Sequence, residues 1–267
     1  MSTPPDSRTA DTAGHQTTSA SEFDRLFGSE GQSGDSAFSA IARLVDPDLP
    51  PDLDLFSFLC ADLLHHITRQ LELHPGQLLA DLGCGRGGPG LWLASHTHAA
   101  LIGIDFSPVA IAQARHRATS LPVEAAFAVA DLAGLPLADQ CVDRAVSLDA
   151  LQYAPDRLAA ARQALRILKP GGRLVLTGWH PHTPGDERLP ARHRHTDWSR
   201  VLRAAGFTDV HCAGAPTWDA AYQGIYRTAL TLHAAPGTAL AGLQGEAQRR
   251  LPTAHLLHRV AVTAVRS

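Results

Sequence analysis

The stretch Leu78–Gly90, LLADLGCGRGGPG, decides the expected fold of this 267-residue chain. It opens with an apolar run, interrupted only by Asp81, of the kind found in strands buried on both faces of a parallel sheet. Four glycines follow between positions 83 and 88. They let the backbone turn tightly and leave bare peptide against which a ligand can lie. Pro89 suits a first helical turn, where its missing N–H has no partner. The stretch predicts a nucleotide-type binding loop between a strand and a helix.

The glycines alone leave the ligand of this loop open. Gly83, Gly85 and Gly88 satisfy the dinucleotide pattern G-x-G-x-x-G, and Asp105 follows at the distance of a ribose-binding carboxylate. An NAD-dependent oxidoreductase is therefore one hypothesis. Asp81, two residues before the first glycine, favours a different ligand. Its carboxylate would repel a pyrophosphate held by the same loop, but it suits a ligand with a cationic amino group.

Two further expected strands end in acidic residues. The apolar segments 100–106 and 124–130 predict strands, and Asp105 and Asp131 lie where they end. Ligands of open α/β sheets bind just outside the carboxyl ends of the strands. We therefore expect Asp81, Asp105 and Asp131 to lie at one site.

Later segments continue the alternation of strands and helices. Strands are expected at 141–148, 173–179, 207–212 and 258–266, and helices at 108–117, 155–168 and 196–205. The order of these motifs, together with LKPGGRLVL at 168–176, resembles the class I S-adenosylmethionine (SAM)-dependent methyltransferases. Within them it is most similar to the small-molecule branch related to the ubiquinone/menaquinone methyltransferases. The resemblance covers residues 71–207.

The resemblance implies a Rossmann-like α/β sandwich. Its sheet has seven strands, mostly parallel with the last antiparallel, and helices cover both faces. SAM is the implied cofactor and S-adenosylhomocysteine (SAH) the product. Asp105 is implied to bind the ribose, Phe106 to lie against adenine, and Asp131 to accept from the adenine amine. The expected cofactor-binding residues are Asp81, Gly83, Cys84, Gly85, Asp105, Phe106, Asp131, Leu132 and Leu148.

The acceptor of the methyl group is expected beyond the fourth and fifth strands. The substrate candidates are Phe27, Asp149, Gln152, Tyr153, Trp179, Tyr222 and Tyr226. His180 is the best-placed proton acceptor, because imidazole titrates near neutral pH and this residue follows the fifth strand. A base is needed only for an acceptor that loses its proton early, so the methylated atom (O, N or C) stays open. The His-x-His repeats near it lack a carboxylate cluster, and no metal site is expected.

Composition divides the chain into a tail, a lid and a methyltransferase domain. Residues 1–20 carry almost no apolar side chains, which predicts a disordered tail. Residues 21–51 have apolar residues at helical spacing. The resemblance implies that such N-terminal helices form a lid over the site, and the alternative is that they only pack on the sheet edge. The domain spans 52–267 and begins with an amphipathic helix over 52–72. Within it, 216–252 shows two helical faces, which predict a cap over the acceptor or a dimer surface.

Charge and composition argue against several partners. The formal net charge of −3 does not indicate a basic surface for nucleic acid. No apolar run is long enough to cross a membrane. The four cysteines show no paired spacing. The rarity of lysine indicates a high-GC, bacterial source. We expect a cytoplasmic enzyme, with a homodimer left open, that methylates a small aromatic or apolar natural product. The alternatives are the NAD enzyme and a SAM-binding enzyme that catalyses a cyclisation, with or without methylation.

Overall fold

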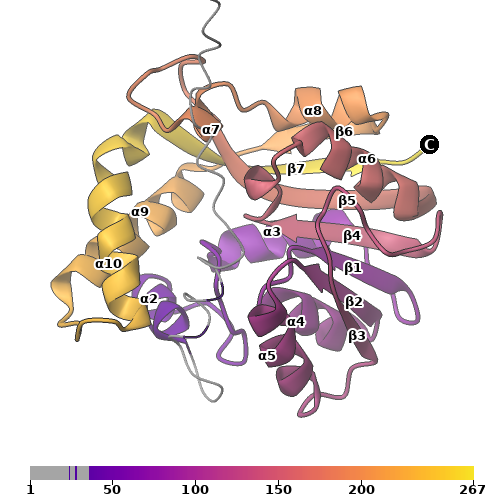
Figure 1. Cartoon of the computed structure of the whole chain (residues 1–267), viewed down its shortest axis with the longest axis horizontal. Coiled ribbons are helices and arrows are strands. Elements are labelled where there is room, and N and C mark those ends of the chain that lie inside the picture. The colour runs from indigo at the N-terminus through magenta and orange to yellow at the C-terminus, as the bar shows by residue number, and fades with distance from the viewer. Residues whose placement is uncertain (1–23, 25–27, 29–35) are drawn as a thin grey trace, which may run out of the picture.

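The structure is a computed structural model that describes Asp24, Gly28 and residues 36–267. The expected tail and the substrate candidate Phe27 lie outside the described residues. One seven-stranded sheet has the strand order β3-β2-β1-β4-β5-β7-β6 (Figure 1). The strands are β1 (Leu78–Leu82), β2 (Ala100–Asp105), β3 (Ala125–Val129), β4 (Val142–Leu148), β5 (Leu168–Pro181), β6 (Thr208–Ala213) and β7 (Leu257–Val265).

The pairing of the strands confirms the expected fold class. The pairs β1–β2, β1–β4, β2–β3 and β4–β5 are parallel. Only β7 runs the other way, and it pairs antiparallel with both β5 and β6. The first four strands in sheet order, β3 to β4, therefore all end at the same edge, as the acidic residues at 81, 105 and 131 require.

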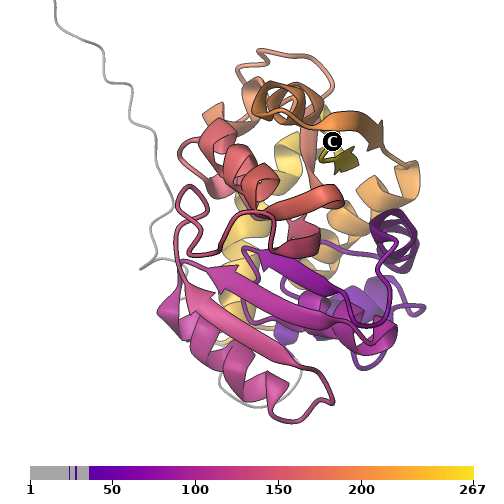
Figure 2. The same cartoon turned by 90° about the vertical axis from the view of Figure 1, so that its right-hand side faces the viewer.

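Helices cover both faces of the sheet, as Figure 2 shows. On one face lie α3 (Ala61–Leu71), α4 (Gly88–Thr97) and α5 (Pro108–Ala118), whose apolar side chains join one core cluster. On the other face lie α6 (Arg157–Ile167) and α8 (Trp198–Ala205), which belong to a second cluster. A fully buried Leu or Ile stabilises the fold by about 1.5–3 kcal/mol. The two clusters hold the strand ends, and hence the site, in place.

A third group of helices packs together at the left of the sheet in Figure 1. It consists of α2 (Ala37–Val45), α9 (Pro216–Thr231) and α10 (Ala239–Arg250), which contact one another. Short turns of helix lie at Leu151–Tyr153 (η1), Ala191–Arg194 (α7) and Leu251–Leu256 (η2). The two helical faces expected in 216–252 are thus α9 and α10. No helix in the described part of the chain is long and apolar enough to cross a bilayer.

The helix expected over 52–72 is shorter in the structure. It begins only at Ala61, and the preceding residues form turns and extended chain. Their backbone groups bind side chains elsewhere: the Leu55 N–H donates to a serine hydroxyl of α2, and the Phe58 N–H donates to Asp149 Oδ2 at 3.0 Å. These distant partners replace helical hydrogen bonds, because buried backbone groups need only some partner.

The strand β5 is longer than the expected 173–179. It pairs with β7 continuously from Arg173–Val265 to Pro181–Leu257. This pairing supplies backbone partners beyond the point where the parallel ladder with β4 ends at Thr177. As a result, Trp179 and Arg259 lie side by side above the site.

Candidate cofactor and acceptor site

A cavity of about 340 Å³ lies at the carboxyl ends of the strands. Every residue expected to bind the cofactor lines it, from Asp81 through the glycine loop to Leu148. These residues come from four separate strand ends, and the parallel pairing brings them to one edge of the sheet. The same cavity continues past β4 to aromatic side chains from other parts of the chain.

The glycine loop needs glycine at two positions for different reasons. Gly83 has a left-handed backbone with φ of 80°, and a Cβ on it would lie 2.2 Å from the Ala150 side chain. A Cβ on Gly90 would lie 2.3 Å from the Asp81 carboxylate. Larger residues at these positions would push apart the loop and the first strand. The loop therefore keeps bare backbone facing the cavity.

Asp81 is a buried carboxyl group, only 2% exposed. Burial, and after it the charge of Asp105, raise the pKa of Asp81 to about 7, although a hydrogen bond from the Gly90 backbone opposes both effects. A nearby cation would favour the charged form. The cavity at this point thus fits a ligand with an ammonium group, as the amino-acid end of SAM carries.

Asp105 is held in a fixed orientation by backbone donors. The Gly85 N–H donates to its Oδ2 at 2.8 Å, and the Ser107 N–H donates to its Oδ1 at 2.9 Å. Burial raises the pKa of Asp105, although these hydrogen bonds oppose the shift. Each oxygen keeps a lone pair that can accept from a hydroxyl. The geometry fits a ribose diol.

Asp131 differs from the other two acidic residues because it is exposed. Its Oδ1 accepts from the Ala133 N–H at 2.7 Å, which orients the carboxylate at the cavity rim. Phe106 and Leu132 line the cavity between Asp131 and the loop. The arrangement would suit a planar ligand that lies against the apolar side chains and meets the carboxylate at its edge.

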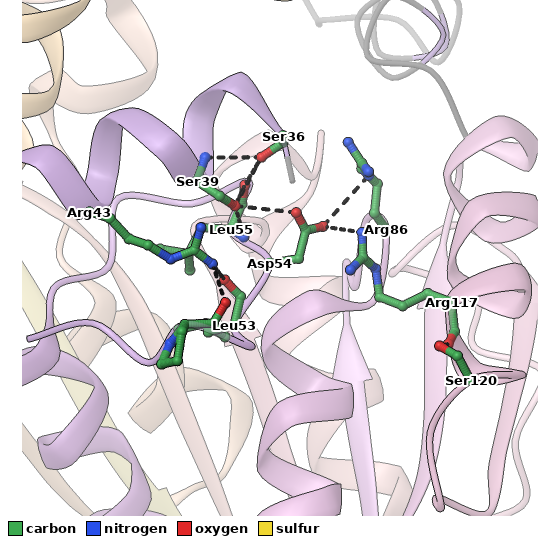
Figure 3. A network of polar contacts seen from close by, with 10 residues as sticks. Ser36, Ser39, Arg43, Leu53, Asp54, Leu55, Arg86, Arg117 and Ser120 are labelled. Atoms are coloured by element: carbon green, nitrogen blue, oxygen red, sulfur yellow. Dashed lines mark hydrogen bonds and ion pairs between the residues drawn. The ribbon is translucent and has the colours of Figure 1, made fainter. Parts of the chain in front are cut away.

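Asp54 joins the segment before α3 to the glycine loop (Figure 3). Its Oδ2 lies 2.6 Å from Arg117 Nη2 and 3.7 Å from Nε of Arg86, a loop residue. Its Oδ1 accepts from the Ser39 hydroxyl of α2 at 3.2 Å. The Asp54 carbonyl also lies where a Cβ on Gly88 would fall. No sequence motif indicated this residue, since its partners lie 15 to 63 positions away.

The far end of the cavity has aromatic walls. Phe58 contacts Trp179, Tyr222 and Tyr226 edge to face, with ring centroids 5.8, 5.0 and 5.0 Å apart. Phe38 of α2 lies 5.2 Å from Phe58. The predicted helix over 52–72 did not identify Phe58 as a site residue, because a regular helix would turn its side chain away from the cavity. The helix α10 adds further lining residues, Ala239, Gly242, Leu243 and Glu246.

The described acceptor candidates divide between two adjoining cavities. Asp149, Gln152, Tyr153 and Trp179 line the main one. Tyr222 and Tyr226 line a smaller one of about 20 Å³ behind it. The two cavities share wall residues: Phe58, Gln152, Tyr153, Trp179 and Glu246. Gln152 and Trp179 therefore stand on the boundary between them.

The Asp149 carboxylate is occupied by an internal ion pair. Arg259 Nη2 lies 2.9 and 3.1 Å from its two oxygens, and the Thr177 hydroxyl donates to it at 2.7 Å. Arg259 is fully buried, and its guanidinium lies 4.5 Å from the centre of the Trp179 ring. The pair fixes the floor of the acceptor end. Alternation in β7 predicted a strand there, but gave no sign of a partner 110 residues away.

His180 does not line either cavity. Side chains alternate along a strand, so His180 lies on the opposite face of β5 from Trp179. Its Nε2 accepts from the Trp198 N–H at 2.9 Å, while burial and the neighbouring His258 lower the pKa of His180 to about 4. The expectation that it faces the acceptor does not fit this placement. The described residues contain no group of three or more side chains suited to a metal.

Strand order, the glycine loop and three carboxyl groups at successive strand ends define a class I methyltransferase fold. Residues 80–176 match the family model of a methyltransferase domain. This segment is thus similar to a methyltransferase domain, and solved structures of the same fold include complexes with SAM and SAH.

Relatives support this class. Tocopherol O-methyltransferase of Arabidopsis thaliana is 31% identical over 191 residues, which cover 62% of this chain and 54% of that one. The 27-O-demethylrifamycin SV methyltransferase of Amycolatopsis mediterranei is 36% identical over 116 residues, 43% of each chain. The crystal structure of the [4+2]-cyclase SpnF superposes with a TM-score of 0.61 at 26% identity, covering 77% of this chain and 80% of that one. The chain thus spans about half the length of the curated relatives it matches.

Proposed function

We propose that this protein transfers the methyl group of SAM to a small-molecule acceptor with an apolar or aromatic body. One observation carries the proposal: a single cavity joins the three carboxyl groups at the strand ends to the aromatic walls around Phe58 and Trp179. A cofactor and an acceptor can therefore meet without leaving the protein.

The residues at the strand-end part of the cavity would hold the cofactor. Bound SAM supplies an electrophilic methyl group on a sulfonium sulfur. Asp81 would bind its amino group, Asp105 its ribose hydroxyls, and Phe106 and Asp131 its adenine. Leu148 lines the cavity where this part meets the acceptor end.

The residues at the aromatic end of the cavity would exclude water and align the acceptor. Phe38, Phe58 and Trp179 come from three different elements and close around the same space. Holding two reactants in line can contribute roughly 7–11 kcal/mol to lowering the barrier. Methyl transfer from the sulfonium of SAM needs little catalysis beyond this alignment, because the positive charge on the sulfur is lost as the new bond forms.

We also propose that α9 and α10 serve as a cap over the acceptor. Four residues of α10 line the cavity, and α9 carries Tyr222 and Tyr226 of the smaller one. The names of the two curated relatives specify small-molecule acceptors, a tocopherol and a demethylrifamycin. A natural-product acceptor fits these names and the aromatic walls. The proposed bacterial, cytoplasmic setting rests on composition.

Calorimetric titration with SAH, with NAD in a parallel titration, tests the cofactor. We expect micromolar binding of SAH, loss of that binding in Asp105→Ala, and no binding of NAD. Incubation with methyl-labelled SAM and fractionated small molecules then tests transfer. Binding of NAD without SAH would overturn the proposal.

Cyclisation is a second candidate, favoured by the similarity to SpnF, whose structure is described as that of a [4+2]-cyclase. Both reactions would use the same cofactor residues and the same aromatic cavity. Product analysis separates them: a methyltransferase adds the label to the acceptor, whereas a cyclase gives an unlabelled isomer. Turnover without label in the product would favour the cyclase.

A further inference from the structure

Three buried polar atoms without partners lie around the acceptor end of the cavity. They are Ser57 Oγ, Gln152 Oε1 and Trp179 Nε1, and no described residue forms a hydrogen bond with them. Each of the three residues is at most 6% exposed. Buried polar atoms are almost always hydrogen-bonded, so such atoms around a cavity indicate groups intended for a ligand.

The Gln152 amide is fixed with its oxygen as the unused group. Its Nε2 donates to the Asp149 carbonyl at 2.9 Å, which settles which end of the amide is the oxygen. The Asp149 carboxylate is itself held by Arg259 and Thr177. Gln152 Oε1 is thus a preoriented acceptor of one hydrogen bond at the boundary of the two cavities.

Trp179 offers the complementary group. The indole N–H can only donate. Its ring is held edge to face by Phe58 and tilted against Tyr222, with centroids 5.8 and 5.3 Å apart. The Arg259 guanidinium lies over the ring face and draws π-electron density toward itself, which strengthens the N–H as a donor.

We propose that Gln152 Oε1 and Trp179 Nε1 together select a neutral hydroxyl group on the acceptor, an inference that rests on the proposed function. A hydroxyl donates one hydrogen bond and accepts others, so it alone among these groups offers the partner that each of the two atoms needs. An ammonium group only donates and would leave the indole N–H unpaired. A carboxylate only accepts and would face the amide oxygen with a negative charge.

The charged groups around this pair are of both signs. Glu246 lines both cavities, interacts with the Tyr226 hydroxyl, and has Arg250 one turn later on α10. Arg192 lies over the Tyr153 ring at 5.0 Å and also lines the smaller cavity. The pair therefore lies among charges of both signs, and its selectivity rests on the hydrogen-bonding groups of Gln152 and Trp179 themselves.

Four probes of one shape test this selectivity on SAH-saturated protein: 2-naphthalenemethanol, its methyl ether, 2-naphthylmethylammonium and 2-naphthoate. The chain has four tryptophans, so a ¹⁵N spectrum contains four indole N–H signals. Trp92 and Trp218 already donate to aspartates, whereas Trp198 Nε1 is unpartnered like Trp179 but lines neither cavity. Trp198 is therefore the matched internal control.

We expect the alcohol to shift the Trp179 indole signal downfield, to leave that of Trp198 in place, and to bind roughly 5- to 10-fold more tightly than the ether or either ion. Trp179→Phe and Gln152→Leu should each remove this preference while SAH binding persists, which also shows that the variants fold. Trp198→Phe should retain the preference.

Two results would overturn the inference: equal or tighter binding of an ion or of the ether, or no shift of the Trp179 signal. Either result with normal SAH binding leaves the proposed methyltransferase function intact. Failure of SAH to bind would instead contradict that function. The probe titration of the ligand-free protein would then still report on the Gln152–Trp179 pair.

Discussion

Asp81 makes cofactor binding depend on pH. Burial raises the pKa of this carboxyl to about 7, and a ligand ammonium group binds the ionised form. Below pH 7 the free protein is mostly protonated here, so binding must first release a proton. We expect the affinity for SAH to be constant above pH 8 and to fall roughly tenfold per pH unit below 7. Calorimetry between pH 6 and 8.5 measures this.

The Asp81→Asn variant supplies the control for this pH dependence. It lacks the titrating group, so its affinity for SAH should be weak and nearly independent of pH over the same range. Titration in two buffers of different ionisation enthalpy should show one proton released by the unmodified protein at pH 6. A flat pH profile in the unmodified protein would contradict the assignment of the ammonium group to Asp81.

The Asp149–Arg259 pair should contribute strongly to stability. Removing one member of a buried ion pair leaves the other charge unpaired, at a cost of about 3–5 kcal/mol. We expect Arg259→Met to lower the free energy of unfolding by this amount in urea titrations. Arg188→Met, which breaks the pair with Asp186 in a solvent-exposed loop, should cost much less. Equal effects of the two substitutions would show that the buried pair is not a main stabilising contact.

At the scale of elements, Asp54 should hold α2 and the segment 52–60 against the cofactor loop. Hydrogen bonds to charged groups contribute about 1.5–3 kcal/mol each. We therefore expect Asp54→Asn to speed amide exchange in α2 and to weaken SAH binding, while α6 on the opposite face exchanges as before. Hydrogen–deuterium exchange resolves the two helices.

Asp52→Asn is the matched control, because the Asp52 side chain is 60% exposed and, within the described part of the chain, its polar contacts are with Trp92 and His96. Its effect on stability should stay within about 0.5 kcal/mol. If Asp54→Asn leaves α2 exchange at the level of this control, the ion pairs with Arg86 and Arg117 do not fasten the segment.

Sequence patterns correctly predicted the elements that depend on residues close to them along the chain. The strand and loop at 78–90 follow from an apolar run and its glycines, and the acidic strand ends follow from parallel pairing. The prediction of a helix over 52–60 was wrong because the apolar spacing of this segment fits a helix equally well. Distant side chains, among them Asp149 as the partner of the Phe58 N–H, favour extended chain instead. The ion pair of Arg259 spans 110 residues, beyond any local pattern.

For the whole molecule, SAH should act as a stabilising ligand. The cavity is built from α2, the strand ends and α10, so an unfolded chain has no comparable site. A ligand at 100 times its dissociation constant then stabilises the native state by about 2.7 kcal/mol. We expect the melting temperature to rise by roughly 5–10 °C. Differential scanning fluorimetry measures this, and NAD at the same concentration should leave the melting temperature unchanged.

The strip of chain from Asp54 to Phe58 is anchored at both ends. Asp54 is tied to the cofactor loop through Arg86, and Phe58 is tied to Asp149 at the acceptor end. A shift of the strip on binding one ligand therefore changes the wall that meets the other. If the strip moves in this way, the two ligands are coupled thermodynamically, and such coupling must be reciprocal. Cofactor and acceptor would then each raise or lower the affinity of the other by the same factor.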